Sequence, residues 1–340
     1  MTDAGKRSNS EQQRQSTADA ARPFRDFSID RLRGVLVIAM VIGDFLGGIQ
    51  SVPSFLQHAP DIGLTIADTV APAFVFVIGL NFGPSFVRRS RSGGAEAYRH
   101  FLWRYLGLIG LGAIISGGGA LVGSPTTWGV LQAIGVAGLL CLLVIQLPTW
   151  ARFVVGALLL LGYQYVLDEG MLQSVLESVH GGFFGALSWA ALLILSTAVA
   201  DVWRRGMTPY LVCCGALVVI AGVSALLIPV SKHRVSLSFI MITLAISAVV
   251  FLVVKALDRR GRWREGFLCW WGQNALALYL LHLVVLAVFV LPDSPWWYSQ
   301  APLWLATLQV TAIIAFMSTV AWWLQKRWQL SPAGSSAKAS

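Results

Sequence analysis

Long apolar runs follow one another along the chain from residue 27 to about residue 330, and short polar segments separate them. An α-helix needs about 20 mainly apolar residues to cross a bilayer, which is close to the length of each run. The pattern therefore predicts an all-α polytopic membrane protein, a bundle of about ten transmembrane helices. The expected spans are 32–50, 64–87, 101–122, 128–147, 151–167, 184–202, 208–229, 235–257, 267–291 and 301–325.

The two ends of the chain lack such runs. Residues 1–26 are rich in Ser, Gln, Arg and Ala, and residues 331–340 read SPAGSSAKAS. Segments with so little to bury are expected to be disordered tails. The N-terminal segment also lacks the apolar core of a cleavable signal peptide. We therefore predict one transmembrane domain, residues 27–330, between two flexible tails.

Composition argues against a soluble protein. Hydrophobic residues make up 56% of the 340 residues and charged residues 12%, about half the charged fraction of an average soluble domain. The net charge of +9 does not indicate nucleic-acid binding, because the Lys and Arg residues cluster in short loops between apolar runs. The cysteines are expected to be small core residues, without a disulfide or a metal site. They are Cys141, Cys213, Cys214 and Cys269.

The distribution of positive charge predicts the orientation. With the N-terminus placed inside, all but Lys232 and Arg234 of the 25 Lys and Arg residues fall on the inner side. Cytoplasmic loops of membrane proteins carry this excess of positive residues. Both termini are therefore predicted to be cytoplasmic, and His58 to lie on the outer side. Lys232 and Arg234, with His233 between them, indicate an anion-binding outer loop or, alternatively, an ordinary two-residue exception to the rule.

The segment 57–72, QHAPDIGLTIADTVAP, interrupts the apolar pattern between the first two spans. Its prolines and glycine predict an irregular loop that carries His58, and Asp68 follows about four residues into the second span. An imidazole exchanges a proton near neutral pH, and a nearby carboxylate can orient it. The two residues therefore predict a catalytic site. The alternative is that His58 is a solvated loop residue and Asp68 only caps a helix.

Further polar residues lie within the apolar spans. Asp44 is roughly 15 Å into the first span at 1.5 Å per residue, where a carboxylate is costly and normally faces a polar interior. In the ninth span, Asn274, Tyr279 and His282 form a polar line that would border a substrate channel. Ordinary hydrogen bonding between helices is the alternative for all four residues. Gln132, at the start of the fourth span, carries little weight alone.

With these residues assembled, the chain resembles the heparan-α-glucosaminide N-acetyltransferase family of transmembrane acyltransferases and its bacterial relatives. Six blocks match the family in order. They are FSIDRLRG (27–34), HAP with GLTIAD (58–68), PAFVFVIG (72–79), GVLQ (129–132), PVSK with SLSF (229–239), and GQNA with Tyr279 and His282 (272–282). The chain departs from the family pattern at Asp61-Ile62, where Trp-Asn is usual, and at Asp44, where Asn is usual.

The resemblance implies transfer of an acetyl or similar acyl group from cytoplasmic acetyl-CoA to a sugar or amino-sugar acceptor on the outer side of a bacterial inner membrane. In the family, the histidine at the position of His58 is implicated in the transfer, as a base or as an acyl carrier. The candidate catalytic residues are His58, Asp68 and Asp44. The candidates for substrate binding are His282, Asn274, Tyr279, Gln132 and Lys232. The candidates for the CoA phosphates are Arg31, Arg33 and Arg104.

Two other functions remain open from the sequence. The same Asp44, Asp68 and His282 would serve as a proton path in a transporter or flippase for a small anion or a lipid-linked glycan intermediate. A catalytically inactive member that acts as a structural partner is a further alternative. The expected partners are the bilayer, acyl-CoA and the acceptor, with no nucleic acid and no metal, and the sequence leaves a homo-oligomer open.

Overall fold

The computed structural model describes residues 26–121, 128–260, 266–290 and 295–330. Both predicted tails therefore lie outside the described residues, apart from Asp26. Helices make up nearly all of the described chain, and its β-structure is one isolated bridge between Ile62 and Ser231. The helices are α2 (Phe27–Leu46), α3 (Ile66–Ser90), α4 (Gly94–Leu121), α5 (Val130–Val144), α6 (Thr149–Val166), α7 (Leu172–Leu176), α8 (Gly182–Arg205), α9 (Met207–Leu227), α10 (Leu237–Arg260), α11 (Phe267–Gln273), α12 (Ala275–Val290), α13 (Trp296–Ser299) and α14 (Leu303–Leu330).

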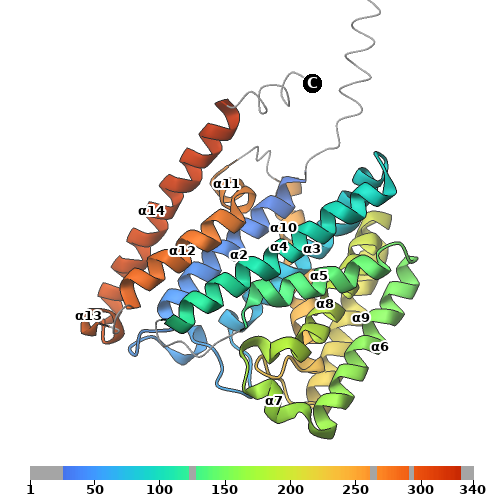
Figure 1. The fold of residues 1–340 in the computed structure, drawn as a ribbon, viewed down its shortest axis with the longest axis horizontal. Coiled ribbons are helices and arrows are strands. Elements are labelled where there is room, and N and C mark those ends of the chain that lie inside the picture. Colours follow the sequence, from blue (N-terminus) through green and yellow to red (C-terminus); the bar gives the residue numbers. More distant parts are fainter. Residues whose placement is uncertain (1–25, 122–127, 261–265, 291–294, 331–340) are drawn as a thin grey trace, which may run out of the picture.

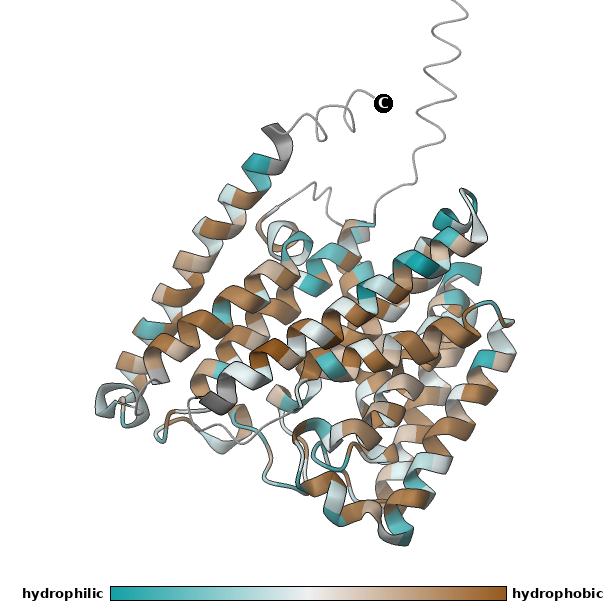
Figure 2. Ribbon diagram, viewed as in Figure 1, coloured by the Kyte–Doolittle hydropathy of each residue, from teal (hydrophilic) through white to brown (hydrophobic). Residues whose placement is uncertain are grey.

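An all-α polytopic membrane protein is confirmed. Seven helices of the described chain are long and apolar enough to cross a membrane, and an eighth span results if α11 and α12 are taken as one broken helix. Apolar residues fill the middle of the long helices, and hydrophilic residues gather toward their ends (Figure 2). Each of the ten expected segments contains a helix. The count of ten stays a prediction, because α5 is short and the 20-residue α2 carries several charges.

The start of α2 and the end of α14 lie at the same end of the bundle (Figure 1). We call this the terminal end. The opposite end carries two loops, residues 47–65 between α2 and α3 and residues 228–236 between α9 and α10. We call it the loop end. Charge distribution predicts that the loop end faces outward.

Helix α8 forms the centre of one half of the bundle, because its side chains are buried on all sides and it packs against α3, α5, α6, α9 and α10. Small residues allow these close approaches. A Cβ atom added at Gly79 of α3 would lie 2.5 Å from the Cβ of Ser196 on α8, so only a glycine fits there. The packing holds α3, and with it Asp68, in a rigid position.

The other half of the bundle joins α2 to α11, α12 and α14. Helices α2 and α11 touch through their backbones, because a Cβ atom on Gly34 would overlap the carbonyl oxygen of Leu268, and one on Gly272 that of Asp30. Helix α11 then ends, and α12 continues at an angle of 86°. Asn274 caps this break, with both its backbone N–H and its side-chain amide donating to the Trp270 carbonyl.

Candidate active site

A cavity of about 1250 Å³ runs along the bundle between α2, α3, α4, α5 and the α11–α12 break. This volume exceeds the usual range of small-ligand sites. At the loop end the cavity is lined by His58, His180, Lys232 and His233, and at the terminal end by Arg33, Arg88 and Arg104. Arg33 and Asp44 both line it and lie eleven residues apart on α2, which is roughly 16 Å of helix. The cavity therefore reaches from one end of the bundle toward the other.

Asp68 organises the loop end of the cavity. Its side chain is completely buried, and one carboxylate oxygen (Oδ2) accepts hydrogen bonds from the Thr65 backbone N–H at 3.0 Å, the Thr65 hydroxyl at 2.9 Å and the Ala59 backbone N–H at 3.2 Å. These bonds cap the first turn of α3. The second oxygen (Oδ1) lies 2.8 Å from Nδ1 of His58. Asp68 therefore caps the helix, as one reading of the sequence expected, and also contacts the histidine.

The side chain of His58 is 38% exposed and lines the cavity. Because an ionised carboxylate only accepts hydrogen bonds, we place the imidazole proton on Nδ1, where it donates to Asp68. The nearby Lys232 ammonium then donates to the carboxylate and not to this nitrogen. The other ring nitrogen, Nε2, then carries the lone pair and has no hydrogen-bond partner among the described residues. A histidine held in this way can accept a proton or attack an electrophile through Nε2.

Lys232 completes this group from a loop that is distant in sequence. Its Nζ lies 3.0 Å from Nδ1 of His58 and 3.4 Å from Oδ1 of Asp68. Burial lowers the pKa of the Lys232 ammonium, whereas the charge of Asp68 opposes that shift. The ammonium therefore balances the buried carboxylate beside the imidazole.

The two loops that bring these residues together are tied to each other. The Gly63 N–H donates to the Val230 carbonyl at 2.8 Å, next to the bridge between Ile62 and Ser231. Asp61 accepts from the Ser231 hydroxyl at 2.7 Å and pairs with the guanidinium of Arg234. The hydrogen bond from Arg234 lowers the pKa of the Asp61 carboxyl. This tie positions Lys232 at His58.

The outer loop at Lys232 and Arg234, where anion binding stays a prediction, carries two ion pairs within the chain. Each cation pairs with a carboxylate of the same chain, Lys232 with Asp68 and Arg234 with Asp61. The sequence pattern missed this because both partners lie more than 160 residues away along the chain. Lys232 nevertheless lines the cavity, whereas Arg234 joins the two loops through its ion pair with Asp61.

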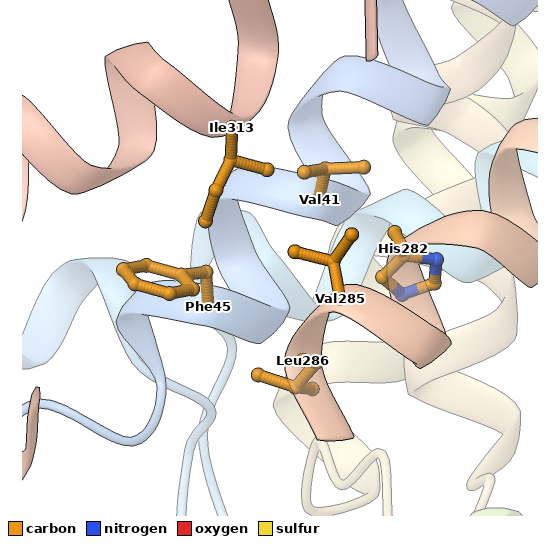
Figure 3. Close-up of a pocket in the computed structure, with 6 residues that line it drawn as sticks. All are labelled: Val41, Phe45, His282, Val285, Leu286 and Ile313. Atoms are coloured by element: carbon orange, nitrogen blue, oxygen red, sulfur yellow. The ribbon is translucent and has the colours of Figure 1, made fainter. Parts of the chain in front are cut away.

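A second His–Asp pair lies among the helices. Nε2 of His282 on α12 is 3.1 Å from Oδ2 of Asp44 on α2. The exposure is the reverse of that in the first pair, because the His282 side chain is 3% exposed and that of Asp44 is 35% exposed. Asp44 and Tyr279 line the large cavity, whereas His282 borders a separate small apolar cavity (Figure 3). His282 is therefore not among the lining residues of the large cavity in the described chain, and its part in substrate binding stays a prediction.

Two other substrate-binding candidates make structural contacts. Gln132 accepts from the Gly129 N–H at 2.6 Å and from the Ser116 hydroxyl at 3.3 Å, which caps the start of α5. Asn274 caps the break between α11 and α12. The side chain of the preceding residue, Gln273, lines the cavity instead, and its buried Nε2 has no hydrogen-bond partner within the described ranges. Sequence reasoning quoted Gln273 within a block but did not single it out.

The three arginine candidates separate in the structure. Arg33 and Arg104 line the cavity. Arg31 pairs with Asp258 at the end of α10 and is not among the lining residues of the described chain. Arg88, near the end of α3, takes its place on the wall. The sequence analysis counted Arg88 only as a loop charge, because nothing in the pattern shows which helix face turns inward.

Comparison with known proteins agrees with the resemblance. The family model for the catalytic region of heparan-alpha-glucosaminide N-acetyltransferase matches residues 25–181. The human protein of that name is 35% identical over 126 residues, which is 34% of this chain and 18% of the human protein. In this region the chain is similar to the catalytic region of the heparan-α-glucosaminide N-acetyltransferase family. The mouse protein is 28% identical over 177 residues, 50% of this chain and 24% of the mouse protein.

The chain matches a quarter or less of the length of these curated relatives. The family region contains Asp44, His58 and Asp68. Lys232 and His282 lie beyond it in sequence, and the fold brings them to the two carboxylates. The site therefore combines residues of the family region with residues of the C-terminal half.

Proposed function

We propose that this protein is a membrane acyltransferase that moves an acetyl or similar acyl group from acyl-CoA to a sugar or amino-sugar acceptor. The donor binds from the terminal end of the cavity, which the charge distribution predicts to be cytoplasmic, and the acceptor binds at the loop end. One observation carries the proposal, namely that a single cavity joins three arginines to a histidine whose Nε2 is unpaired. A bacterial cytoplasmic membrane is the location that fits this orientation.

In this mechanism, the reactive atom of His58 is Nε2, and two routes are open to it. As a general base it takes the proton of the attacking amine or hydroxyl, a contribution of about 10²–10⁴ in rate. As a carrier, the same nitrogen accepts the acyl group from the thioester and passes it on. Asp68 holds the ring in the required tautomer and stabilises the positive charge that the ring gains. Either route needs the unpaired Nε2.

The donor end supplies groups suited to CoA. Arg33, Arg88 and Arg104 line the cavity, and a guanidinium binds phosphate through paired hydrogen bonds. The Arg33 guanidinium also donates to the Asp30 carboxylate and the Gly272 carbonyl. Gln273 also lines this part of the cavity, close to where the pantetheine arm would pass. The broken α11–α12 span fits this assignment, since irregular backbone within a membrane occurs where it lines a cavity.

The test is release of CoA from acetyl-CoA by the purified protein with a panel of amino sugars and sugars. His58→Ala is expected to lower the rate at least about 10²-fold. His100→Ala is the matched control, because His100 lies on α4 but not among the cavity-lining residues of the described chain. Wild-type rates in His58→Ala, or no release with any acceptor, would overturn the proposal.

A proton-coupled transporter is the second candidate, because the cavity that reaches toward both ends also exposes the Asp44 carboxyl. It predicts accumulation of an anion or lipid-linked glycan in proteoliposomes with no release of CoA. Uptake that persists without CoA release, and that Asp44→Asn abolishes, would replace the acyltransferase by this function.

A further inference from the structure

The hydrogen bonds of His282 require one proton more than a neutral imidazole and a carboxylate provide. Nδ1 lies 2.5 Å from the Tyr279 carbonyl oxygen, and Nε2 lies 3.1 Å from a carboxylate oxygen of Asp44. A carbonyl and an ionised carboxylate both only accept, and a neutral imidazole has a single N–H. Both contacts are hydrogen bonds only if the pair is imidazolium with carboxylate, or neutral imidazole with a protonated carboxyl.

In both arrangements the Asp44–His282 pair has no net charge. This state suits its surroundings, because an unbalanced charge is costly among apolar groups. Behind His282 lies a cavity of about 10 Å³ whose other walls are Val41, Phe45, Val285, Leu286 and Ile313 (Figure 3). The space offers a water no second polar partner, so it gives no wet route to the histidine. The proton can exchange only on the Asp44 side, which faces the large cavity.

We propose that Asp44 and His282 hold one shared proton and deliver it, through the Asp44 carboxyl, to the leaving sulfur of CoA in the large cavity. This inference rests on the proposed acyl transfer. In that reaction a bond forms between the acceptor N or O and the acyl carbon, and the C–S bond breaks. The acceptor proton passes to His58, and the electron pair left on sulfur takes the proton of the pair. Solvent then removes the proton from His58 and restores that of the pair.

Other ionisable groups around the pair are few. The Tyr279 ring packs at a tilt against the His282 ring, with 5.1 Å between ring centroids, and the Tyr298 hydroxyl of α13 donates to the Phe45 carbonyl on α2. Lys232 and His180 are within electrostatic range of Asp44 from the loop end. The wall from α14 is the apolar Ile313. Of these neighbouring groups only the lysine carries a full charge at neutral pH.

An aspartate at this position differs from an amide in one respect. In Asp44→Asn, the amide N–H₂ can donate to Nε2 while Nδ1–H donates to the Tyr279 carbonyl, so every contact is satisfied with no additional proton. The variant preserves shape and hydrogen bonding and removes only the exchangeable proton. It is therefore the conservative variant with which to test the proposal.

The test compares wild type with Asp44→Asn in two measurements. The first is a pH titration of ¹⁵N-labelled histidine by NMR in lipid nanodiscs, with the His282 signal assigned through His282→Gln. We expect wild type to lose a proton from the pair as pH rises, and Asp44→Asn to show an unchanging neutral His282. A wild-type His282 that is neutral at every pH, and indifferent to Asp44→Asn, would overturn the shared proton.

The second measurement is the pH profile of CoA release. Wild type is expected to lose rate on the alkaline side as the pair deprotonates, and Asp44→Asn to be about 10²-fold slower without that alkaline limb. An unchanged rate and profile in Asp44→Asn would overturn delivery to sulfur. If wild type releases no CoA at all, the acyltransferase proposal fails, whereas the histidine titration still decides whether the pair holds its proton.

Discussion

The two His–Asp pairs of this protein are built from the same residue types with opposite exposure. In the first pair the carboxylate of Asp68 is fully buried and His58 is exposed to the cavity. In the second pair His282 is buried and Asp44 faces the cavity. The buried member of each pair is held by further hydrogen bonds, from Thr65 and Ala59 in one case and to the Tyr279 carbonyl in the other.

This difference indicates which member of each pair meets the ligand. A buried, fully bonded carboxylate can only orient the imidazole beside it, so the reactive group of the first pair is His58. A buried imidazole with both nitrogens engaged can only hold the carboxyl before it, so the reactive group of the second pair is Asp44. Identical chemical pairs can therefore serve as a base and as an acid, because the surroundings select the exposed group.

The largest expected effect is on the first pair. Asp68→Asn replaces an acceptor of five contacts by an amide, so the imidazole loses its orienting partner and Lys232 its counter-charge. We expect CoA release to fall about 10³-fold, within the range for loss of a general base. Thr65→Val is the control, because it removes only the capping hydroxyl and should cost about 1 kcal/mol of stability with little change in rate. Equal rates in the two variants would contradict the orienting role.

The second prediction concerns the contact between α2 and α11, since α2 carries Asp44 of the second pair. Gly272→Ala places a methyl group against the Asp30 carbonyl oxygen and forces α11 away from α2, which carries Asp44. We expect a loss of about 3 kcal/mol in unfolding free energy, as is typical for overpacking. Denaturant unfolding in detergent measures it. Gly162→Ala on α6 is the matched control, since a Cβ there meets nothing within 4 Å. Similar midpoints for both variants would show that the α2–α11 contact is not tight.

A third prediction separates the two pairs by pH. Lys232→Met removes a positive charge 3.0 Å from Nδ1 of His58. Protonation of the base then becomes easier, so the acid limb of the pH–rate profile should move to higher pH by about one unit. The His282 titration should change less, because Lys232 contacts only the first pair. A shift of the alkaline limb alone would contradict this prediction, because it would show that Lys232 acts on the Asp44–His282 pair.

The smallest effect is expected at the Asp61–Arg234 ion pair, which joins the two loops of the loop end. Arg234→Ala should lower the unfolding free energy by about 1 kcal/mol, because the ion pair with Asp61 is partly exposed. Asp61→Arg combined with Arg234→Asp should recover most of the loss. Since pairing lowers the pKa of Asp61 below its ordinary value of 3.8, the stabilisation is present above that pH and disappears as the pH falls through the folded-state pKa. Thermal melts at neutral and acid pH test both points.

Much of this architecture could be predicted from the sequence. The length of the apolar runs determines that the chain forms membrane helices, since a bilayer demands about 20 apolar residues and satisfied backbone groups. The proximity of His58 and Asp68 was also predictable, because the two lie on one short connection and a helix start. The ordered blocks indicated a resemblance to the family, and the match of the catalytic-region model to residues 25–181 supports it.

Only the tertiary structure decided the rest. Lys232 lies 174 residues from His58, and His282 lies 238 residues from Asp44. Apolar runs are nearly equal on every face, so they do not show which side of a helix turns inward. Backbone contacts between glycines and the tie between two loops set that rotation. The sequence by itself therefore determined the helices and the reactive residue types, whereas packing determined which arginines line the cavity and which member of each His–Asp pair is exposed.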